Sequence, residues 1–232
     1  MYNNKEYTAI IPVRAGSTRL KDKNIYPFNG TTLLENKILQ LKQVDLIDHI
    51  VVSSDSDQML ELAVKHNVTP HKRSWEYCDE KTKSFGEVVE HVCSEVKGDI
   101  TIWATATSPL VLPHLYKEAI ILFEEALNKG YDSLLSVEPF QRYILTSQGP
   151  LNYKHGLGHV PSQELEVYYF KTNGIMISSR VNMIKWQYLY GKKPYLFDID
   201  KIYCVDVDDV LDMAQAEIWL NLLNSGRYKP KN

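Results

Sequence analysis

The sequence has few cysteines and no long apolar run. Cys78, Cys93 and Cys204 are odd in number and far apart in a chain of 232 residues, a spacing that fits neither a disulfide framework nor a zinc-binding motif. We therefore expect three reduced thiols, as in a cytoplasmic protein. The N-terminus lacks an apolar stretch of signal-peptide length, and no run of about 20 apolar residues is present to span a membrane.

An excess of positive charge is also missing. The formal net charge is −3 and the pI is about 6.2, so bulk attraction to nucleic acid or to an anionic membrane surface is not expected. Small-molecule substrates are expected instead. The content of 44% hydrophobic and 24% charged residues is typical of a globular protein with one sizeable core. We predict that residues 1–232 form a single domain.

Buried strands and amphipathic helices alternate through the first part of the chain. The predicted strands are 7–13, 49–54, 99–106 and 132–137, and the predicted helices are 32–44, 58–67, 86–96 and 115–130. Strands and helices that alternate over short connections are typical of βαβ units with right-handed crossovers. The predicted fold class is therefore α/β, with a Rossmann-like, doubly wound and mostly parallel sheet.

The alternation stops after residue 138. Residues 139–180 are rich in Tyr, Gly, Pro and Gln and contain short strand-like runs, which predicts an inserted β-rich arm or hairpin within the domain. Apolar and aromatic arms of this kind often mediate dimerisation, so we expect a homodimer, and a lid is the alternative. A last strand is predicted at 201–207 and a last helix at 210–223.

A basic loop follows the first predicted strand. The stretch IIPVRAGSTRLKDKN, residues 10–24, places Arg14 and Lys23 beyond the carboxyl end of that strand, where open α/β sheets bind ligands. Ala15, Gly16 and Ser17 allow backbone N–H groups to approach an anion. Neither GxxxxGK[ST] nor GxGxxG is present, so the loop is neither a Walker loop nor a dinucleotide fingerprint. We interpret it as a phosphate-binding loop, with a solvated surface turn as the alternative.

Two carboxylates precede the last predicted helix. Asp206 and Asp208 flank Val207 on the predicted strand, and the alternation of a strand puts both on one side. Two hard oxygen ligands suit Mg²⁺, whose shell is completed by phosphate oxygens and water. The alternative is that Asp208 or Asp209 only caps the helix that follows.

Several motifs together resemble one known family. The string I-P-x-R-x-G-S, followed by K-x-K-N, resembles the signature loop of the acylneuraminate cytidylyltransferases, also called CMP-sialic acid synthetases. Further segments are similar to that family in the same order along the chain: VVSSDSDQMLELAVKHNV (51–68), KRSWEYCDEKTKS (72–84), ATSPL (106–110), KTNGIMI (171–177) and VDVDDVLDMAQAE (205–217). Matches in one order over most of a chain form a specific signal.

The resemblance implies an activity and a set of site residues. It implies a Mg²⁺-dependent enzyme that transfers CMP from CTP to the hydroxyl of a 2-keto-3-deoxy sugar acid and releases pyrophosphate, for surface glycan synthesis. The implied catalytic residues are Arg14, Lys23, Asp206 and Asp208, and the last two are the implied metal ligands. The implied nucleotide-binding residues are Pro12, Arg14, Ala15, Gly16, Ser17, Lys23, Asn24, Asp79, Thr82, Thr105, Thr107 and Ser108. The implied sugar-acid-binding residues are Thr105, Gln163, Asn173 and Gly174.

The sugar half of the pattern departs from the family. At four positions where the family has other polar or aromatic residues, this chain has Thr105, Val111, Ser162 and Ile177. Polar groups of a substrate bind poorly when they are left without partners. The departures therefore predict a sugar acid other than N-acetylneuraminate. The candidate replacement contacts are Gln141, Arg142, Lys154, His155, His159 and Lys171. Two alternatives stay open, namely a nucleotide-sugar-dependent glycosyltransferase and a catalytically silent nucleotide-binding homologue.

Three further groups of residues are predicted to have structural roles. The pair Asp198 and Asp200 does not align with the metal-ligand positions of the family. It is predicted to lie at the surface or at a sheet edge. The aromatic run 188–197 is predicted to pack at the arm or a dimer contact rather than to stack on a base. The histidines that share no motif are predicted to lie at the surface or at helix ends: His49, His66, His71, His91 and His114.

Overall fold

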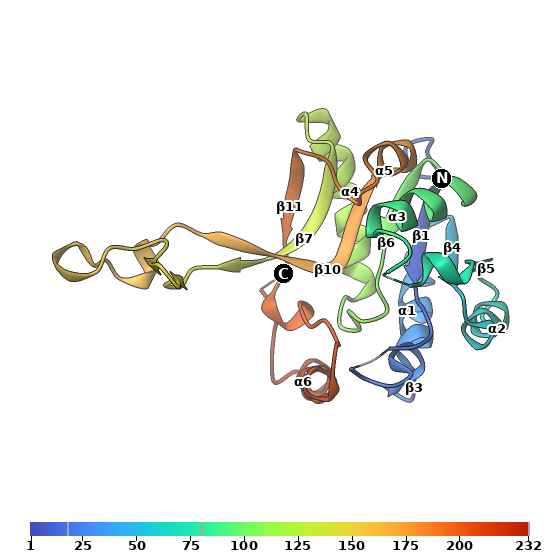
Figure 1. Cartoon of the computed structure of the whole chain (residues 1–232), viewed down its shortest axis with the longest axis horizontal. Coiled ribbons are helices and arrows are strands. Elements are labelled where there is room, and N and C mark those ends of the chain that lie inside the picture. Colours follow the sequence, from blue (N-terminus) through green and yellow to red (C-terminus); the bar gives the residue numbers. More distant parts are fainter. Residues whose placement is uncertain (18, 80, 232) are drawn as a thin grey trace.

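The computed structural model describes residues 1–17, 19–79 and 81–231, and a seven-stranded sheet forms its centre (Figure 1). The strands are β1 (Tyr7–Pro12), β4 (His49–Ser54), β5 (Thr69–Lys72), β6 (Ile100–Trp103), β7 (Ser133–Phe140), β10 (Tyr168–Ser179) and β11 (Pro194–Asp198). Their order in the sheet is β11-β7-β10-β6-β1-β4-β5. All neighbours pair in parallel except β10, which is antiparallel to β6 and β7. The predicted α/β class with a mostly parallel sheet is confirmed.

Helices cover both faces of this sheet. The helices are α1 (Leu33–Leu41), α2 (Asp57–Lys65), α3 (Phe85–Glu95), α4 (Pro113–Asn128), α5 (Arg180–Trp186) and α6 (Val210–Asn224). Helices α1, α2 and α4 pack in one core with Ile11 of β1, whereas α3 and α5 pack in a second core with Ile10. Successive side chains of a strand point to opposite faces, so the run IIP of β1 contributes to both cores, as a doubly wound sheet requires.

Polar side chains fix where the helices begin. Ser84 and Glu87 form a capping box at the start of α3, and the side chain of Ser56 accepts from the backbone N–H of Met59 at the start of α2. Such caps satisfy N–H groups that have no partner within the helix. The helix α2 therefore begins directly after its cap, Ser56.

A long two-stranded arm projects from the sheet (Figure 1). It is formed by the outer ends of β7 and β10. These strands pair in antiparallel fashion, with Tyr168 opposite Phe140 in the arm and the pairing continuing into the sheet. Beyond them lie the short strands β8 (Leu145–Thr146) and β9 (Gly149–Pro150) and the 3-10 turns Gly156–Gly158 and Ser162–Glu164. The predicted arm ended at residue 180, but residues 176–179 pair with β6 within the sheet, because the apolar run of β10 continues directly into the core.

The segment 201–207 is not a strand, which corrects the prediction. It begins with a single 3-10 turn and continues as irregular chain to α6. Val205 and Val207 are buried and alternate with the half-buried Asp206 and Asp208. The alternation of apolar and polar residues in this segment therefore reflects which side chains are buried against the core, and not pairing with a neighbouring strand.

The preceding acidic pair divides into two environments. Asp198 is exposed on the edge strand β11, as predicted. Asp200 is buried, which corrects the prediction of a surface or edge residue. Its carboxylate accepts from the backbone N–H of Ile202 and the hydroxyl of Tyr228. Asp200 thus has a structural role, as the cap of a 3-10 turn and the anchor of the C-terminal segment.

Short elements complete the chain. They are the strand pair β2 (Pro27–Phe28) and β3 (Thr31–Thr32), and the 3-10 turns Lys23–Ile25, Trp75–Tyr77 and Lys201–Tyr203. Among the helices that the structure describes, none has the length and apolar character needed to cross a bilayer.

A buried lysine joins α1 to the loop that follows β6. Lys37 is fully buried, and its ammonium donates to the carbonyl oxygen of Ser108 and to the hydroxyl of Tyr116, at 2.9 Å each. Asn36 and Gln40 of the same helix donate to the carbonyl oxygen of Pro109. Three side chains of one helix thus hold the turn around Pro109 in place.

Replacement of Lys37 by methionine is expected to remove a pH dependence of stability. Burial lowers the pKa of Lys37 to about 7, whereas an unfolded lysine titrates near pH 10.4. Between these pH values the unfolded chain binds a proton that the folded chain does not, so the wild type gains stability as the pH rises. Urea unfolding measures the free energy of unfolding at pH 7 and at pH 9.5. Between these pH values it is expected to rise by on the order of 2–3 kcal/mol more in the wild type than in Lys37→Met. Parallel pH profiles would contradict this assignment.

Candidate functional site

A cleft of about 600 Å³ lies beyond the carboxyl ends of β1 and β6. These strands are neighbours in the sheet. From β1 the chain winds outward to β4 and β5, and from β6 it continues to the other half of the sheet. Such a reversal of strand order is the position where open α/β sheets bind ligands. The loops after both strands line the cleft, as the sequence predicted for the first of them.

Cationic side chains from four segments line this cleft. Arg14, Arg19 and Lys23 come from the loop after β1, Arg73 directly follows β5, Lys83 precedes α3, and Lys171 belongs to β10. Arg73 is buried and donates to the carbonyl oxygen of Val13 at 2.6 Å, and this burial lowers its pKa. Clustered fixed cations of this kind suit a ligand with several phosphate groups.

Side-chain contacts fix the course of the basic loop. The buried Asn24 donates to the carbonyl oxygen of Arg14 at 3.2 Å, and the backbone N–H of Ala15 donates to Asp55 at 3.0 Å. Gly16 has a φ of 74°, in the left-handed region that favours glycine. The N–H of Ala15 is therefore already engaged by a carboxylate, and Ser17 is the small residue of this loop that lines the cleft.

The two predicted metal ligands have different surroundings. Asp208 accepts from Lys23 and from Arg19 through one oxygen, at 2.9 Å each. Burial opposes its ionisation, but these two cations hold the pKa of Asp208 below its ordinary value. Asp206 accepts from Asn173 at 2.6 Å through Oδ2, and its buried Oδ1 has no hydrogen-bond partner among the described residues. The helix cap is Asp209 alone.

A bulge in β10 brings Asn173 into the cleft. The register between β10 and β7 shifts between Lys171 and Met176, a change that re-aims side chains and often lies next to active sites. Asn173 receives a hydrogen bond on its side-chain oxygen from Lys171 at 2.7 Å and on its carbonyl oxygen from Thr105 at 2.8 Å. A chain of contacts therefore runs from Lys171 through Asn173 to Asp206.

The residue after Asn173 has no room for a side chain. A Cβ on Gly174 would lie 2.7 Å from a methyl carbon of Val111. Val111 and Ile177 are fully buried in the core, so these two departures from the family pattern are packing positions in this chain and line no part of the cleft.

Aromatic side chains also line the cleft. Phe85 contacts Trp103 and Tyr188 edge to face, with ring centroids 6.2 Å and 6.1 Å apart, and Tyr77 and Tyr190 also line the cleft. Flat aromatic rings suit contact with a base or a sugar ring. The run from residue 188 was predicted to pack at the arm or a dimer contact. Tyr188 and Tyr190 do pack, on Phe85 and on each other, but they line the cleft instead of lying on the arm.

The structure brings most of the predicted nucleotide-binding residues to one cleft. The predicted residues that line it are Pro12, Arg14, Ser17, Lys23, Asn24, Asp79, Thr105, Thr107, Asn173 and Asp208. Asp206 is joined to it through Asn173. Ser108 is buried and bonds Thr105 within the turn, and the exposed Thr82 bonds Asp79.

Other predicted residues lie away from this cleft. Ala15 and Gly16 are exposed and do not line it, and Gly174 is buried behind Asn173. Gln163 lies in a 3-10 turn of the arm, where its carbonyl oxygen accepts from the side chain of Gln141. The structure therefore does not place Gln163 in the same cleft as the other predicted sugar-acid residues.

Several cleft residues escaped the sequence analysis. They are Arg19, Arg73, Tyr77, Lys83, Phe85, Trp103, Tyr188 and Tyr190. A signal existed for Arg73, because it directly follows a strand that ends at the ligand-binding edge of a parallel sheet. The aromatic residues carried no such signal, since their spacing is also that of core positions.

The fold and the cleft define a Rossmann-like nucleotidyltransferase, with clustered cations and nearby carboxylates at the switch point of the sheet. A family model described as cytidylyltransferase matches residues 8–226. The chain therefore belongs to the cytidylyltransferase family and is an enzyme of the nucleotidyltransferase class, which confirms the resemblance found in the sequence.

Named relatives and solved structures are similar over almost the whole chain. A pseudaminic acid cytidylyltransferase of Campylobacter jejuni is 24% identical over 226 residues, covering 90% of this chain and 94% of the relative. A CMP-N,N'-diacetyllegionaminic acid synthase of Legionella pneumophila is 28% identical over 229 residues, covering 92% and 96%. The structure of a CMP:2-keto-3-deoxy-manno-octonic acid synthetase complexed with CTP has a TM-score of 0.59 at 14% identity, covering 95% of this chain and 86% of that one.

Proposed function

We propose that this enzyme transfers CMP from CTP to the hydroxyl of a 2-keto-3-deoxy sugar acid, a sialic-acid-like nonulosonic acid or a related acid, and releases pyrophosphate in surface glycan synthesis. The observation that carries the proposal is the cleft that Arg14, Lys23, Arg73 and Asp208 line, to which Asp206 is joined through its hydrogen bond with Asn173. The similarity to relatives named for pseudaminic and diacetyllegionaminic acid supports this class of acceptor. Family membership favours nucleotidyl transfer over glycosyl transfer.

The cations have a direct role in this reaction. The acceptor hydroxyl attacks the α-phosphate of CTP in line, so negative charge grows on the departing pyrophosphate. Arg14, Lys23 and Arg73 line the cleft on the side of the basic loop, where fixed positive charge neutralises that growth. Positioning and charge neutralisation are the main demands that this chemistry makes of a protein.

The two carboxylates fit a Mg²⁺ ion. The buried Oδ1 of Asp206 lacks a hydrogen-bond partner among the described residues, and an unpaired buried carboxylate oxygen is costly unless an ion or donor satisfies it. Asp206 and Asp208 would hold the ion, which supplies charge neutralisation at the phosphates of CTP. Lys23 and Arg19 both contact Oδ1 of Asp208, and Asn173 fixes the orientation of Asp206.

The acid group of the acceptor has a candidate partner in Lys171. Among the proposed replacement contacts, Lys171 lines the cleft, and it bonds Asn173 next to Asp206. The other candidates, Gln141, Arg142, Lys154, His155 and His159, belong to the arm. We propose that Lys171 binds the carboxylate of the sugar acid and that Thr105 and Asn173 contact its hydroxyl groups, in place of the family contacts missing at Val111 and Ile177.

The test is pyrophosphate release from CTP and Mg²⁺ across a panel of 2-keto-3-deoxy sugar acids. UTP and a set of sugar-1-phosphates serve as controls. Release with CTP and one acid is the expected result and identifies the acceptor. Release with a sugar-1-phosphate alone would assign the enzyme to another acceptor class, and tight CTP binding without release on the whole panel would favour a catalytically silent homologue.

We propose that residues 1–232 form one nucleotidyltransferase domain that assembles as a homodimer through the arm. The arm carries exposed apolar side chains that a monomer leaves in water, among them Leu145, Leu151, Leu157 and Phe170. Apolar surface on an extended projection is typical of a contact between subunits. The three free thiols of the described chain suit a reducing compartment, so a cytoplasmic location is part of the same proposal.

The double variant Leu145→Asp/Leu157→Asp is expected to be monomeric. Both side chains are exposed on the arm, so the substitutions place charge in the proposed contact without disturbing the core. Light scattering is expected to give twice the 26.8 kDa chain mass for the wild type and the chain mass for the variant. The control Val64→Asp, at an exposed apolar residue of α2, is expected to remain dimeric. A monomeric wild type would refute the homodimer.

A further inference from the structure

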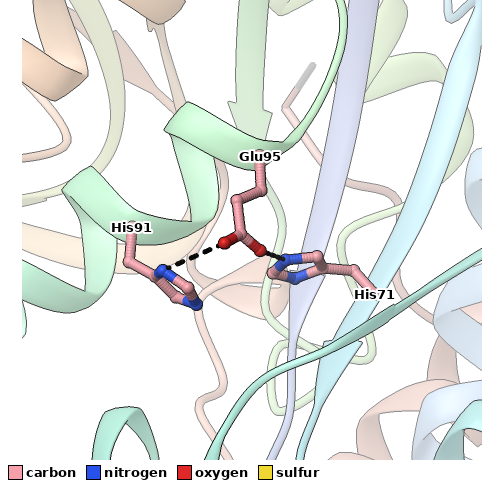
Figure 2. Close-up of side chains that lie close together, drawn as sticks. All are labelled: His71, His91 and Glu95. Atoms are coloured by element: carbon pink, nitrogen blue, oxygen red, sulfur yellow. Dashed lines mark hydrogen bonds and ion pairs between the residues drawn. The ribbon is translucent and has the colours of Figure 1, made fainter.

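A cluster of two imidazoles and a carboxylate lies apart from the residues proposed for catalysis. His71 belongs to β5, whereas His91 and Glu95 are four residues apart on α3. Figure 2 shows the carboxylate of Glu95 between the two rings, with each ring directing a nitrogen toward it. The sequence analysis predicted surface or helix-end roles for these histidines, because nothing in their spacing joins an edge strand to a helix.

The three side chains are spaced as ligands around one small ion. One ligand atom from each lies within 4.8 Å of the other two. The Nε2 of His71 is 2.7 Å from Glu95, and the Nδ1 of His91 is 3.5 Å from it. Ligand atoms at about 2.0–2.1 Å from a tetrahedral ion are about 3.3 Å apart. The separation between His91 and Glu95 is close to this value, and that between His71 and Glu95 is shorter.

The two rings are oriented toward Glu95. The Nδ1 of His71 lies 2.8 Å from the hydroxyl of Ser53, an outer contact that directs Nε2 toward Glu95, as partners of metal-binding histidines do. The nitrogen of His91 that faces Glu95 is Nδ1, and its buried Nε2, on the far side of the ring, has no hydrogen-bond partner among the described residues.

The charge of the carboxylate also suits a cation. A glutamate side chain is ordinarily negatively charged at neutral pH, because its unperturbed pKa is about 4.3. The side chain of Glu95 is 50% exposed, whereas those of His71 and His91 are 12% and 18% exposed. An ion can therefore enter from solvent past Glu95 and meet two ligands that are already ordered.

We propose that His71, His91 and Glu95 bind one transition-metal ion, Zn²⁺ in the first place, with a fourth position open to water. Two imidazoles and one carboxylate are a ligand set of zinc sites, whereas Mg²⁺ prefers oxygen ligands. The site is therefore chemically distinct from the pair Asp206 and Asp208. It lies behind the wall of the cleft, since the ring of His91 stacks on Tyr77 with centroids 3.8 Å apart, and Tyr77 lines the cleft.

The test is calorimetric titration of the chelator-treated full chain with ZnCl₂, in the presence of a large excess of Mg²⁺. One equivalent of Zn²⁺ is expected to bind the wild type. His91→Gln and Glu95→Gln are each expected to weaken binding at least about 100-fold, since each removes one of three protein ligands. Co²⁺ is expected to give the intense visible absorption of a tetrahedral site in the wild type alone.

A matched control separates this site from adventitious binding to surface histidines. His49→Gln changes a half-buried histidine of β4 that lies 3.6 Å from a carboxylate oxygen of Glu6 but has no third ligand nearby among the described residues. It is expected to leave the Zn²⁺ affinity unchanged. Thermal unfolding without metal checks that Glu95→Gln is folded. Wild-type affinity in both His91→Gln and Glu95→Gln, or an equal loss in His49→Gln, would overturn the proposal.

Discussion

Asp206→Asn is expected to lower the rate of pyrophosphate release by about 1,000-fold, the effect of several kcal/mol of lost charge neutralisation at the phosphates. The substitution keeps the size of the side chain and its contact with Asn173. It removes the negative charge of the carboxylate, whose Oδ1 atom is buried and has no hydrogen-bond partner among the described residues. Stability is expected to be unchanged or raised, because the wild type pays to bury that charge. The measurement is kcat with saturating CTP and sugar acid at increasing Mg²⁺, together with urea unfolding.

The neighbouring acidic pair supplies the control for this experiment. Asp198→Asn changes an exposed carboxylate of the edge strand β11 that does not line the cleft, and it is expected to leave kcat unchanged. Asp208→Asn is expected to resemble Asp206→Asn. A turnover of Asp206→Asn within about tenfold of the wild type, a difference of about 1.4 kcal/mol, would rule out Asp206 as a principal metal ligand.

Lys23→Met is expected to lower kcat/KM for CTP by about 100-fold. Lys23 is partly buried in the cleft and its ammonium contacts Asp208 at 2.9 Å, so the variant loses a charge-assisted contact to phosphate of about 1.5–3 kcal/mol. Lys23→Arg is expected to recover part of the loss, because charge is kept while the geometry changes. Initial rates over a range of CTP concentrations measure the effect.

A second lysine of the same loop serves as the matched control. Lys21 is exposed and does not line the cleft, so Lys21→Met removes the same net charge two residues away. Its kcat/KM is expected to equal that of the wild type at moderate ionic strength, where distant exposed charges are screened. Equal losses in Lys21→Met and Lys23→Met would mean that the loop acts through its overall charge and not through the contact of Lys23.

Local pattern predicted the regular part of the fold because its hydrophobic periods are strong. The strand at 49–54 was predicted at its observed bounds, and α2 and α3 begin at polar caps that the helix signals require. The same reasoning failed at 201–207, where Val205 and Val207 alternate with polar residues as a strand does. Alternation reports which side chains are buried, and the chain here buries them without a neighbouring strand.

Some residues of the site could likewise be predicted from the sequence, and others could not. The loop from Arg14 to Asn24 and the acidic segment ending at Asp208 could be predicted because charge at the end of a strand or before a helix is a local feature. Tyr188 could not be selected in the same way, because its role depends on which strand ends and loops meet at one cleft. The bulge that directs Asn173 toward Asp206 is likewise a property of strand pairing.

The sequence by itself determined the class of this enzyme, since the α/β alternation, the basic loop and the ordered family motifs are written in neighbouring residues. Tertiary structure alone decided that Asp208 meets Lys23 across 185 positions, and that His71 meets His91 and Glu95 between an edge strand and a helix. Such contacts arise from sheet order and helix packing, which bring together residues with no common period. Local chemistry therefore set the kind of reaction, and long-range packing set the arrangement of the groups that carry it out.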